Sequence, residues 1–527
     1  MKQVVLVAVA AAVALSALAP ACAAADILAA FPFPSKSHWH MFRQLLHALV
    51  ARGHRLTVIA YFPEENPPPG WEHISLEATQ GAAPQTPNFF EVGDAGAVIE
   101  ALMVSGVGKR LCAAMMETEG VKQLVTSGDR KFDLLLVEVF SNDCYLAFAH
   151  KYRVPVVGAV ALGGGLSWMT DMVGNPFPHA YLPEPMLPLS TGMSFLQRMH
   201  NSLFGNFLRF YRQFYYLPSL DSMVRQHFSD PEMPSLADLE RNTSLLLVNT
   251  HVSFYYPRPL VPNIIEVGGM HIKPPKKLPQ DLQKFMDDAK DGVIFFSLGS
   301  NIKSSDIPEK QKAAILSVFS KLKQKVLWKF DLESMPNQPA NVKLNKWFPQ
   351  NDLLNHKNMK LFITHGGLMS IQEAISAGVP LLGIPVFGDQ NANLARAEAD
   401  GFGMKLRVNE LTEESFGRAL NELLTNPKYK QNAEKRSVLF HDRPEKPMET
   451  AVHWTEYVIR HKGAYHMRSA SLDLAWYQYL LLDVIAALVL LLGALLLLVA
   501  LSVRALYRAA RAALWSPPAG KNRPKRD

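Results

Sequence analysis

Cysteine is scarce in this chain, with three residues among 527. So few cysteines exclude a small fold that depends on a disulfide framework. Cys22 lies in an N-terminal leader, and we expect Cys112 and Cys144 to be buried free thiols, although the two could pair. The sequence also lacks a cluster of metal ligands, because His38 and His40 alone are too few to hold a metal ion. We therefore expect no metal site.

Charged residues make up only 19% of the chain, against 48% hydrophobic residues, which is typical of a folded protein. The formal net charge of +7 would suit a nucleic-acid partner if it were spread over the fold. Most of it comes instead from residues 504–527, with seven basic residues and one acidic residue, and Lys2 supplies one further charge. Residues 3–503 are neutral in sum, so we expect no nucleic-acid partner.

Long hydrophobic runs are confined to the two ends of the chain. Near the N-terminus, a basic start at Lys2 precedes an apolar run over residues 4–18 and small residues over 21–25. This order is typical of a secretory signal peptide. We place the signal peptide at residues 1–25, with cleavage between Ala23 and Asp26.

The second hydrophobic run, residues 480–503, predicts a transmembrane helix. Twenty-four residues of helix reach about 36 Å, and the hydrocarbon core of a bilayer is about 30 Å thick. Aromatic residues lie before the run at 476–479, and Arg504 follows it. By the positive-inside rule, the basic tail at 504–527 stays in the cytoplasm.

The rest of the mature chain, residues 26–479, is then lumenal in a single-pass type I arrangement. It includes a juxtamembrane segment at 461–479. The Asn-x-Ser/Thr sequon at Asn242 makes glycosylation there possible, although sequons often go unused. The sequence therefore predicts a membrane glycoprotein of the secretory pathway.

The start of the mature chain reads as a β-α-β unit. Residues 26–31 form a buried-strand pattern, and a polar loop follows at 34–40. An amphipathic helix is expected from Met41, with Gly53 as its stop, and residues 56–62 form the next strand. Units of this kind build parallel sheets.

Alternating strands and helices recur in two halves of the chain. The first half is expected at 26–256, with irregular apolar helices and loops at 175–240 that can enclose a pocket. A proline-rich linker is expected at 257–279, and a second α/β half at 280–460. The predicted fold class is α/β, with two facing Rossmann-like domains and a ligand cleft between them at the carboxyl ends of the strands.

The motif that carries chemistry is FITHGGLMSIQEAISAGVPLLGIPVFGDQ, residues 362–390. A buried strand ends in a His-Gly-Gly turn, and the helix that follows offers free N–H groups to a diphosphate. Glu373, inside that helix, can accept hydrogen bonds from ribose hydroxyls. Asp389 and Gln390 follow the next strand, and an acid beside an amide suits the hydroxyl groups of a sugar.

This spacing resembles the signature of the UDP-glycosyltransferases, and Ser370, Pro380 and Pro385 fit it as well. Two neighbouring segments resemble the same family, namely WFPQNDLLNH at 347–356 and FSLGSNIKSS at 295–304. The likeness covers nearly all of residues 26–503 and is greatest for the animal, particularly the insect, branch. It implies that Trp347 stacks on uracil, that Gln350 reads the nucleotide, and that Ser300 and His365 contact the diphosphate. It also implies that Glu373 holds the ribose and that Asp389 and Gln390 hold the donor sugar. Gly366, Gly367 and Ser370 belong to the same donor-binding signature.

A catalytic base is expected after the first strand. In the family a histidine in a Ser-His pair takes this role, which here falls on His38 after Ser37. A histidine oriented by a carboxylate suits proton removal from a hydroxyl near neutral pH. Two acids compete as its partner: an ungapped match places the family's aspartate at Glu138, whereas Asp143 fits the insect pattern and is slightly favoured.

The resemblance implies GT-B architecture and an inverting hexosyl transfer, without a metal or other cofactor, from a UDP-sugar co-substrate to a small lipophilic acceptor. The sugar is expected to be glucose, with glucuronate or galactose as alternatives. Detoxification or conjugation of phenols, pigments, hormones or plant compounds in the endoplasmic reticulum membrane is implied. Homo- or hetero-oligomers are compatible with it. The apolar residues near 85–120 and 165–230 are expected to form the acceptor pocket.

Three other classes of protein remain as alternatives. The first is a membrane protein that keeps the fold but only binds or sequesters a lipophile. The second is a two-domain epimerase that processes sugar nucleotides, although the segment from Trp347 to Gln350 is not expected there. The third is an adhesion protein, which only the membrane anchor supports.

Overall fold

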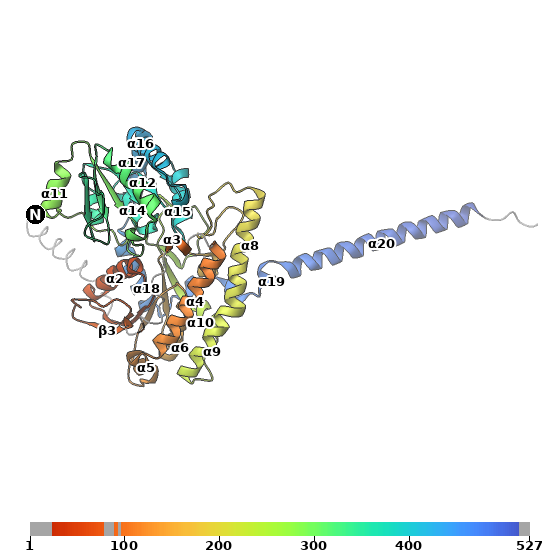
Figure 1. Cartoon of the computed structure of the whole chain (residues 1–527). Coiled ribbons are helices and arrows are strands. Elements are labelled where there is room, and N and C mark those ends of the chain that lie inside the picture. Colours follow the sequence, from red (N-terminus) through yellow and green to blue (C-terminus); the bar gives the residue numbers. More distant parts are fainter. Residues whose placement is uncertain (1–23, 78, 80–88, 93–95, 516–527) are drawn as a thin grey trace, which may run out of the picture. The chain divides into compact units, whose positions relative to one another are not determined.

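The computed structural model describes residues 24–77, 79, 89–92 and 96–515, and Figure 1 shows the course of the chain. Two compact units divide after Ser469. The first unit holds two parallel sheets, and the second holds the long helix α20 (Leu482–Leu514). Residues 1–23 of the predicted signal peptide and 516–527 of the predicted tail lie outside the described residues.

The first sheet has seven parallel strands in the order β3-β2-β1-β4-β5-β6-β7. The central strand β1 pairs with β2 on one side, where Ile27 faces Leu56, and with β4 on the other, where Ile27 faces Leu134. The strands are β1 (Asp26–Phe31), β2 (Arg55–Ala60), β3 (Trp71–Ser75), β4 (Leu134–Glu138), β5 (Val156–Val160), β6 (Thr243–Val248) and β7 (Ile264–Glu266).

Both faces of this sheet are buried, because successive side chains of a strand point in opposite directions and helices cover each side. Ile27 and Phe31 pack in one core with α2 and with α18 (Pro447–Arg460), and Leu28 packs in another with α4 and α9. The helices of this domain are α2 (Lys36–Ala51), α3 (Phe89–Val92), α4 (Ala97–Met116), α5 (Glu119–Thr126), α6 (Ala147–Tyr152), α7 (Ser167–Asp171), α8 (Phe195–Tyr211), α9 (Leu217–Phe228) and α10 (Leu236–Arg241).

The second sheet has six parallel strands in the order β10-β9-β8-β11-β12-β13. Buried residues such as Phe295 and Phe296 alternate between its two cores. Its strands are β8 (Val293–Ser297), β9 (Lys325–Lys329), β10 (Val342–Asn345), β11 (Met359–Thr364), β12 (Leu381–Gly383) and β13 (Gly403–Lys405). Its helices are α11 (Gln280–Asp287), α12 (Glu309–Ser320), α13 (Gln350–Leu354), α14 (Leu368–Ser376), α15 (Gln390–Ala399), α16 (Glu413–Thr425) and α17 (Pro427–His441).

Two segments that the sequence places outside the first domain belong to it in the structure. The expected linker, 257–279, contains β7, which adds a strand to the first sheet. Helix α18 (Pro447–Arg460), expected in the second domain, buries Ala451 and Val458 in the core of the first. Glu456 on this helix also accepts a hydrogen bond from Arg52 at 2.9 Å. The linker and the end of the second domain were therefore placed wrongly, because proline content and alternation do not show where the chain crosses back.

The segment expected to be irregular contains a long helical run. Helix α8 passes into a π-helical turn, η3 (Arg212–Tyr216), and then into α9. Pro218 follows this turn and has no backbone N–H to donate, so the regular hydrogen-bond pattern cannot continue through it. The turn brings Arg212 and Tyr216 to the wall of the main cavity.

The cysteines differ from expectation. Cys112 on α4 and Cys144 in the short helix η2 (Asp143–Leu146) are joined as a disulfide, with their Cα atoms 6.2 Å apart. The expectation of two free thiols was therefore wrong. Two cysteines separated along the sequence do not show whether the fold brings them together.

The second unit consists mainly of α20 (Leu482–Leu514), preceded by α19 (Trp476–Tyr479). By length and composition α20 can cross a membrane, and it is the one such helix among the described residues. It begins close to the expected residue 480 but extends beyond 503, so the first residues of the predicted tail continue the helix.

Candidate active site

Both sheets have a point where the strand order reverses, and the candidate site lies at these two points. Loops leave the two strands beside such a point in opposite directions, which opens a crevice at their carboxyl ends. In the first sheet the point lies between β1, which leads to His38, and β4, which ends at Glu138. In the second it lies between β8, which leads to Ser300, and β11, which leads to His365.

His38 is held by a carboxylate at the first of these points. Its Nδ1 atom lies 2.6 Å from Oε1 of Glu138, whose side chain is buried. The rings of Phe33 and Phe140 lie beside the imidazole, with centroids 5.8 and 5.1 Å away. Helix α2 begins at Lys36, so His38 stands on the first helical turn and not in the loop that the sequence suggests. With Nδ1 engaged, the free imidazole nitrogen is Nε2.

Asp143, the acid that the sequence slightly favours, has another partner. Its carboxylate binds Arg212, with Oδ2 at 3.1 Å from Nη1, and Arg212 also donates to Glu240 at 2.9 Å. All three side chains are buried, and Asp143 is not among the residues that line the cavity. The preference for Asp143 was therefore wrong, because the buried guanidinium of Arg212 takes up its carboxylate.

His365 fits between two glycines at the second point. A Cβ atom on Gly299 would lie 2.5 Å from the ring of His365, and one on Gly367 would lie 2.6 Å from it. Glycine is therefore required on both sides of the ring. This requirement explains why Gly299 follows β8 and why Gly367 follows β11. Burial and the charge of Lys329 lower the pKa of His365 to about 4, so the ring is neutral at pH 7.

Three polar side chains are linked on helices α13 and α14. The amide Nε2 of Gln350 donates to Oγ of Ser370 at 3.0 Å and to the carboxylate of Glu373. Burial raises the pKa of Glu373 to about 7. Trp347 lies beside this group with its ring exposed, and the Nζ atom of Lys329 is 5.6 Å from the ring centroid.

The last predicted pair lies at the start of α15. Asp389 accepts a hydrogen bond from Nδ2 of Asn393 at 2.9 Å, and burial raises the pKa of its carboxyl group. Oε1 of Gln390 accepts from the backbone N–H groups of Val386 and Phe387, at 2.8 and 3.1 Å. Gln390 therefore fixes the loop before Asp389.

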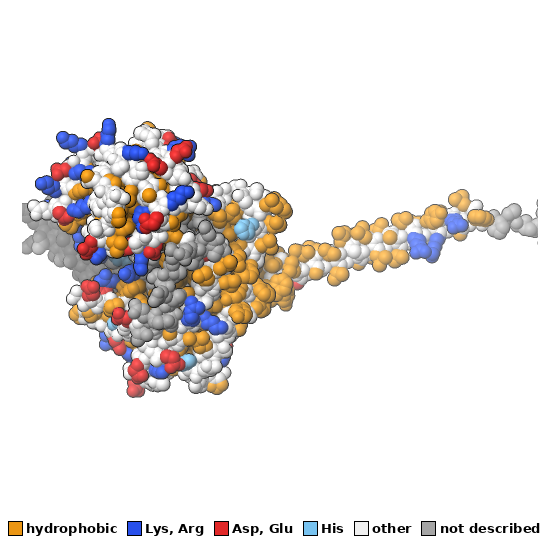
Figure 2. Space-filling model, in the orientation of Figure 1, with side chains coloured by type: hydrophobic (Ala, Val, Ile, Leu, Met, Phe, Trp, Pro, Cys, Tyr) orange, Lys and Arg blue, Asp and Glu red, His pale blue; other side chains and the backbone are white. Residues whose placement is uncertain are grey.

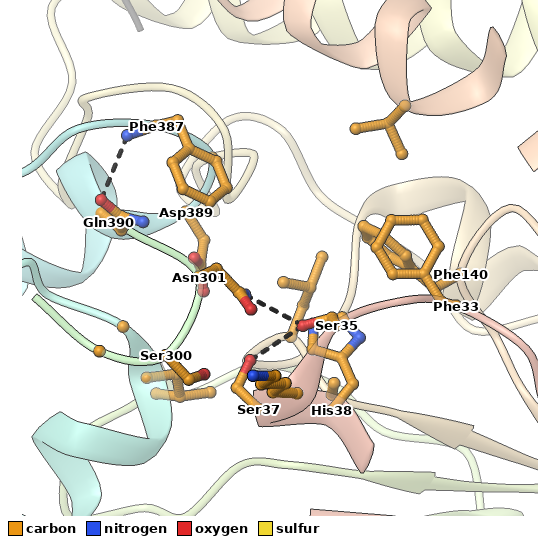
Figure 3. A pocket seen from close by; sticks show the side chains of 18 of the residues that line it. Phe33, Ser35, Ser37, His38, Phe140, Ser300, Asn301, Phe387, Asp389 and Gln390 are labelled. Atoms are coloured by element: carbon orange, nitrogen blue, oxygen red, sulfur yellow. Dashed lines mark hydrogen bonds between the residues drawn. The ribbon is translucent and has the colours of Figure 1, made fainter. Parts of the chain in front are cut away.

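These groups line one cavity of about 1020 Å³ between the two domains, part of which Figure 3 shows from close by. Gly366 and Glu138 are not in its wall. The sequence-predicted residues that line it are His38, Ser300, Trp347, Gln350, His365, Gly367, Ser370, Glu373, Asp389 and Gln390.

Several contacts across the cavity were not predicted from the sequence. Oγ of Ser35 accepts from Nδ2 of Asn301 at 3.1 Å and lies 3.0 Å from Oγ of Ser37, as the dashed lines in Figure 3 show. The rings of Phe89 and Phe387 stack with centroids 4.2 Å apart. The contacts from Ser35 to Asn301 and from Phe89 to Phe387 join residues far apart in the sequence, and no local pattern signals such pairs.

Lys329 is a further cationic group that sequence reasoning missed. It stands at the end of β9, lines the cavity and donates from Nζ to the carbonyl oxygen of Gly299 at 2.5 Å. Burial lowers the pKa of this lysine. The sequence does hold a signal for this group, because Lys329 stands at the carboxyl end of β9, the strand that pairs with β8. Within the described part of the chain, no three His, Cys, Asp or Glu side chains gather so as to hold a metal ion.

The other end of the cavity is apolar. Its wall includes residues of α4 and of the run from α7 to η3, within the two segments expected to form an acceptor pocket. Residues 80–88 and 93–95 of the first segment lie outside the described residues. The apolar lining includes Ile99, Leu102, Met103, Val107, Leu166, Met169, Met186 and Leu208.

A family profile described as "UDP-glucoronosyl and UDP-glucosyl transferase" matches residues 91–513. UDP-glucosyltransferase 2 of Dactylopius coccus is 40% identical over 466 residues, covering 88% of this chain and 89% of that protein. Human UDP-glucuronosyltransferase 2B15 is 33% identical, covering 85% and 87%. Human 2-hydroxyacylsphingosine 1-beta-galactosyltransferase is 35% identical, covering 94% and 90%.

Solved structures agree on the fold. The crystal structure of UDP-glucose: anthocyanidin 3-O-glucosyltransferase in complex with UDP superposes with a TM-score of 0.57, at 16% identity, over 82% of this chain and 99% of that one. The calicheamicin glycosyltransferase CalG4 superposes with a TM-score of 0.55, at 18% identity, over 83% and 99%. Both are glycosyltransferases, and the likeness to them concerns the two-domain architecture.

Proposed function

The chain belongs to the family of UDP-glucuronosyl and UDP-glucosyl transferases, and we propose that it transfers a hexose, with inversion, to a hydroxyl group of small lipophilic acceptors. It is a UDP-sugar-dependent glycosyltransferase of GT-B architecture. One observation carries the finer proposal. His38 of the first domain and His365 of the second domain line the same cavity, and Glu138 holds His38 from outside its wall.

In the proposed reaction His38 acts as the general base. Its Nε2 accepts the proton of the acceptor hydroxyl while the acceptor oxygen attacks the anomeric carbon of the donor sugar. The bond from that carbon to the β-phosphate oxygen breaks, and UDP leaves with the electron pair. Glu138, bonded to Nδ1 at 2.6 Å, fixes the ring and stabilises the imidazolium that forms.

The departing diphosphate is proposed to be stabilised without a metal ion. The N-terminus of α14 directs free backbone N–H groups toward this position, and Ser300 and neutral His365 can donate hydrogen bonds. Lys329 adds a positive charge in the same wall. Donors that are already oriented lower the cost of the charge that develops on the leaving oxygen.

We assign the uridine to Trp347, Gln350 and Glu373, and the sugar to Asp389 and Gln390. Glucose is the proposed sugar, and glucuronate and galactose are the alternatives that the names of the relatives suggest. The acceptors are proposed to be phenols, pigments, hormones or plant compounds, since the acceptor end of the cavity is apolar. Conjugation of this kind serves detoxification.

We propose that α20 anchors the enzyme in the endoplasmic reticulum membrane, with the catalytic unit lumenal and the basic tail cytoplasmic. Asn242 is exposed at the end of α10, which leaves its side chain free to carry a glycan. Association with a second chain is compatible with this arrangement.

The test is release of UDP from membranes that contain the protein, with UDP-glucose, UDP-galactose and UDP-glucuronate each offered beside a simple phenol. Release with one donor, lost in His38→Ala, would establish the reaction and the base. His40→Gln is the matched control, since His40 lines the same cavity and the proposal gives it no role in proton transfer. UDP binding without release from any donor and a panel of acceptors would favour a protein that sequesters lipophiles.

A further inference from the structure

Arg110 on helix α4 is a cation in the wall of the main cavity, and Figure 2 shows basic side chains at the surface over this helix. Its Nη1 atom would lie 3.7 Å from a Cβ atom on Gly106, so the guanidinium lies back along the helix over Gly106, which lines the same cavity. Within the described part of the chain, this guanidinium forms no ion pair and no hydrogen bond. Arg110 therefore offers charged N–H groups to a molecule in the cavity.

The other lysine and arginine side chains of the cavity wall have partners or belong to the donor end. Arg43 and Arg212 are bonded to carboxylates, and Lys329 donates to a backbone carbonyl oxygen. Burial and, to a smaller extent, the charge of Lys36 lower the pKa of Lys329, which shows that the two lysines lie near one another. Both are then accounted for by the diphosphate position. Arg110 is the guanidinium of the described wall that the donor does not account for.

The place of Arg110 on α4 separates it from the donor. Glu100, near the start of the helix, accepts a hydrogen bond from the backbone N–H of Gly388, beside Asp389, at 2.9 Å. Gly106 follows Glu100 by six residues, which is about 9 Å along the helix axis. The guanidinium over Gly106 therefore stands well beyond the position proposed for the donor sugar, toward the acceptor end.

Helix α4 is packed closely against the acceptor end of the cavity. A Cβ atom on Gly108 would lie 2.2 Å from the carbonyl oxygen of Ser141 and 2.9 Å from the hydroxyl of Tyr216, so only glycine fits there. On the same helix Met103 and Val107 give the wall an apolar surface. Binding pockets are typically apolar with a few polar groups that fix the orientation of the ligand. This end of the cavity can hold the apolar body of an acceptor, with the guanidinium beyond it.

We propose that Arg110 binds a carboxylate of the acceptor, so that the preferred acceptors are phenols with an acid group at the end opposite the hydroxyl that receives the sugar. The planar guanidinium presents two parallel N–H donors, which match the two oxygens of a carboxylate. This ion pair would orient the acceptor with its hydroxyl toward His38. The proposal rests on the transfer reaction proposed above and names its acceptor class.

The experiment compares 4-hydroxycinnamate with its methyl ester, two planar phenols that differ in one negative charge at the end opposite the hydroxyl. Membranes that contain the full chain receive each acceptor with the donor that supports UDP release, and the ratio of kcat/KM for the acid to that for the ester is measured. Arg110→Met should lower this ratio about tenfold and leave kcat/KM for the ester within about twofold of wild type. Arg110→Lys should lower it less, because an ammonium group keeps the charge but not the paired donors.

Lys109→Met is the matched control, because Lys109 is the neighbouring basic residue on α4 and does not line the cavity. It should leave the ratio unchanged. A ratio that Arg110→Met does not alter, or that Lys109→Met lowers equally, would overturn the proposal.

A binding measurement separates this proposal from the transfer reaction itself. Calorimetry on the purified full chain, saturated with UDP, gives the affinities for the acid and for the ester. Arg110→Met should weaken binding of the acid about tenfold and leave binding of the ester unchanged. If this loss is observed but no donor is consumed, the carboxylate site stands and the transfer reaction fails. If both phenols are glycosylated and Arg110→Met changes neither the ratio nor the affinities, the transfer reaction stands and the carboxylate site fails.

Discussion

The carboxylate of Glu100, on helix α4 of the first domain, accepts a hydrogen bond from the backbone N–H of Gly388 in the second domain at 2.9 Å. Glu100 lines the cavity, and burial raises its pKa. Because Gly388 directly precedes Asp389, the contact places two carboxyl groups near the position proposed for the donor sugar. Glu100 thus joins the first domain to the loop of the second domain that leads into Asp389.

We predict that Glu100 disfavours a donor whose sugar carries a carboxylate. The Glu100→Gln variant should raise the ratio of kcat/KM for UDP-glucuronate to that for UDP-glucose about tenfold, the equivalent of about 1.4 kcal/mol. The ratio is the quantity to measure, because a general loss from the weakened bond to Gly388 cancels in it. Glu117→Gln is the control, since Glu117 follows the same helix and does not line the cavity. An unchanged ratio would contradict the prediction.

Because Glu138 and not Asp143 holds His38, we predict that substitution of Glu138 lowers kcat more than substitution of Asp143 does. Glu138→Gln should lower kcat on the order of 10²-fold, because the ring loses the partner that fixes its tautomer and stabilises the imidazolium. Donor binding should stay close to wild type, since Glu138 does not line the cavity. Asp143→Asn is the contrasting variant and should act on thermal stability instead. A larger loss of kcat in Asp143→Asn than in Glu138→Gln would reject the pairing.

The donor half of the site could be predicted from the sequence because its residues lie close together along the chain. The turn at His365 and the residues Glu373, Asp389 and Gln390 all fall within 362–390, and each of the latter three lines the cavity as expected. The βαβ pattern likewise predicted parallel sheets, since the period of the apolar residues is a local property. The strand order then places the loops at the two reversal points.

The rest depended on contacts over long separations. The choice between Glu138 and Asp143 is settled by Arg212, a residue of the segment that was expected to be irregular. The contact from Ser35 to Asn301 joins residues 266 positions apart. Helix α18 returns to the first domain because Ala451 and Val458 pack in the core of that domain. The sequence of the helix does not show which of the two cores this apolar face joins. None of these leaves a local pattern in a single sequence.

The buried group around Arg212 predicts a pH-dependent loss of stability. Arg212→Met would leave Asp143 and Glu240 without their cation, at an expected cost of about 3–5 kcal/mol. Glu240 has a raised pKa of about 7, so the stability that its protonated form contributes is present at low pH and is lost as pH rises through 7. The melting temperature of Arg212→Met should therefore fall more at pH 8 than at pH 6.

Arg225→Met is the control for this variant, because Arg225 pairs with Asp221 at a more exposed place on α9. Its expected cost is about 0–1 kcal/mol, with little dependence on pH. Equal melting temperatures for Arg212→Met and the control would show that the buried cation does not stabilise the fold.

Glu373 predicts that binding of UDP releases a proton. The raised pKa of about 7 means that a large fraction of the carboxyl groups is protonated at pH 7. Ribose hydroxyls that donate to the carboxylate favour its charged form, so binding should lower this pKa and affinity should rise as pH increases through 7. Calorimetry in buffers of different ionisation enthalpy measures the proton count. The Glu373→Gln variant should not release this proton when UDP binds. Only the protons that the phosphates of UDP exchange should then be measured.

Lys329 predicts a donor-binding role that does not require a divalent cation. Lys329→Met should raise KM for the UDP-sugar about tenfold and leave KM for the acceptor nearly unchanged, since the charge lies beside the diphosphate position. Lys329→Arg should retain most of the affinity, and EDTA should not alter the activity of wild type. Lys325→Met is the matched control, because Lys325 stands on the same strand but binds the carbonyl of Phe285 outside the cavity. Activity that EDTA abolishes and Mg²⁺ restores would mean that a metal ion, and not these side chains, neutralises the leaving group.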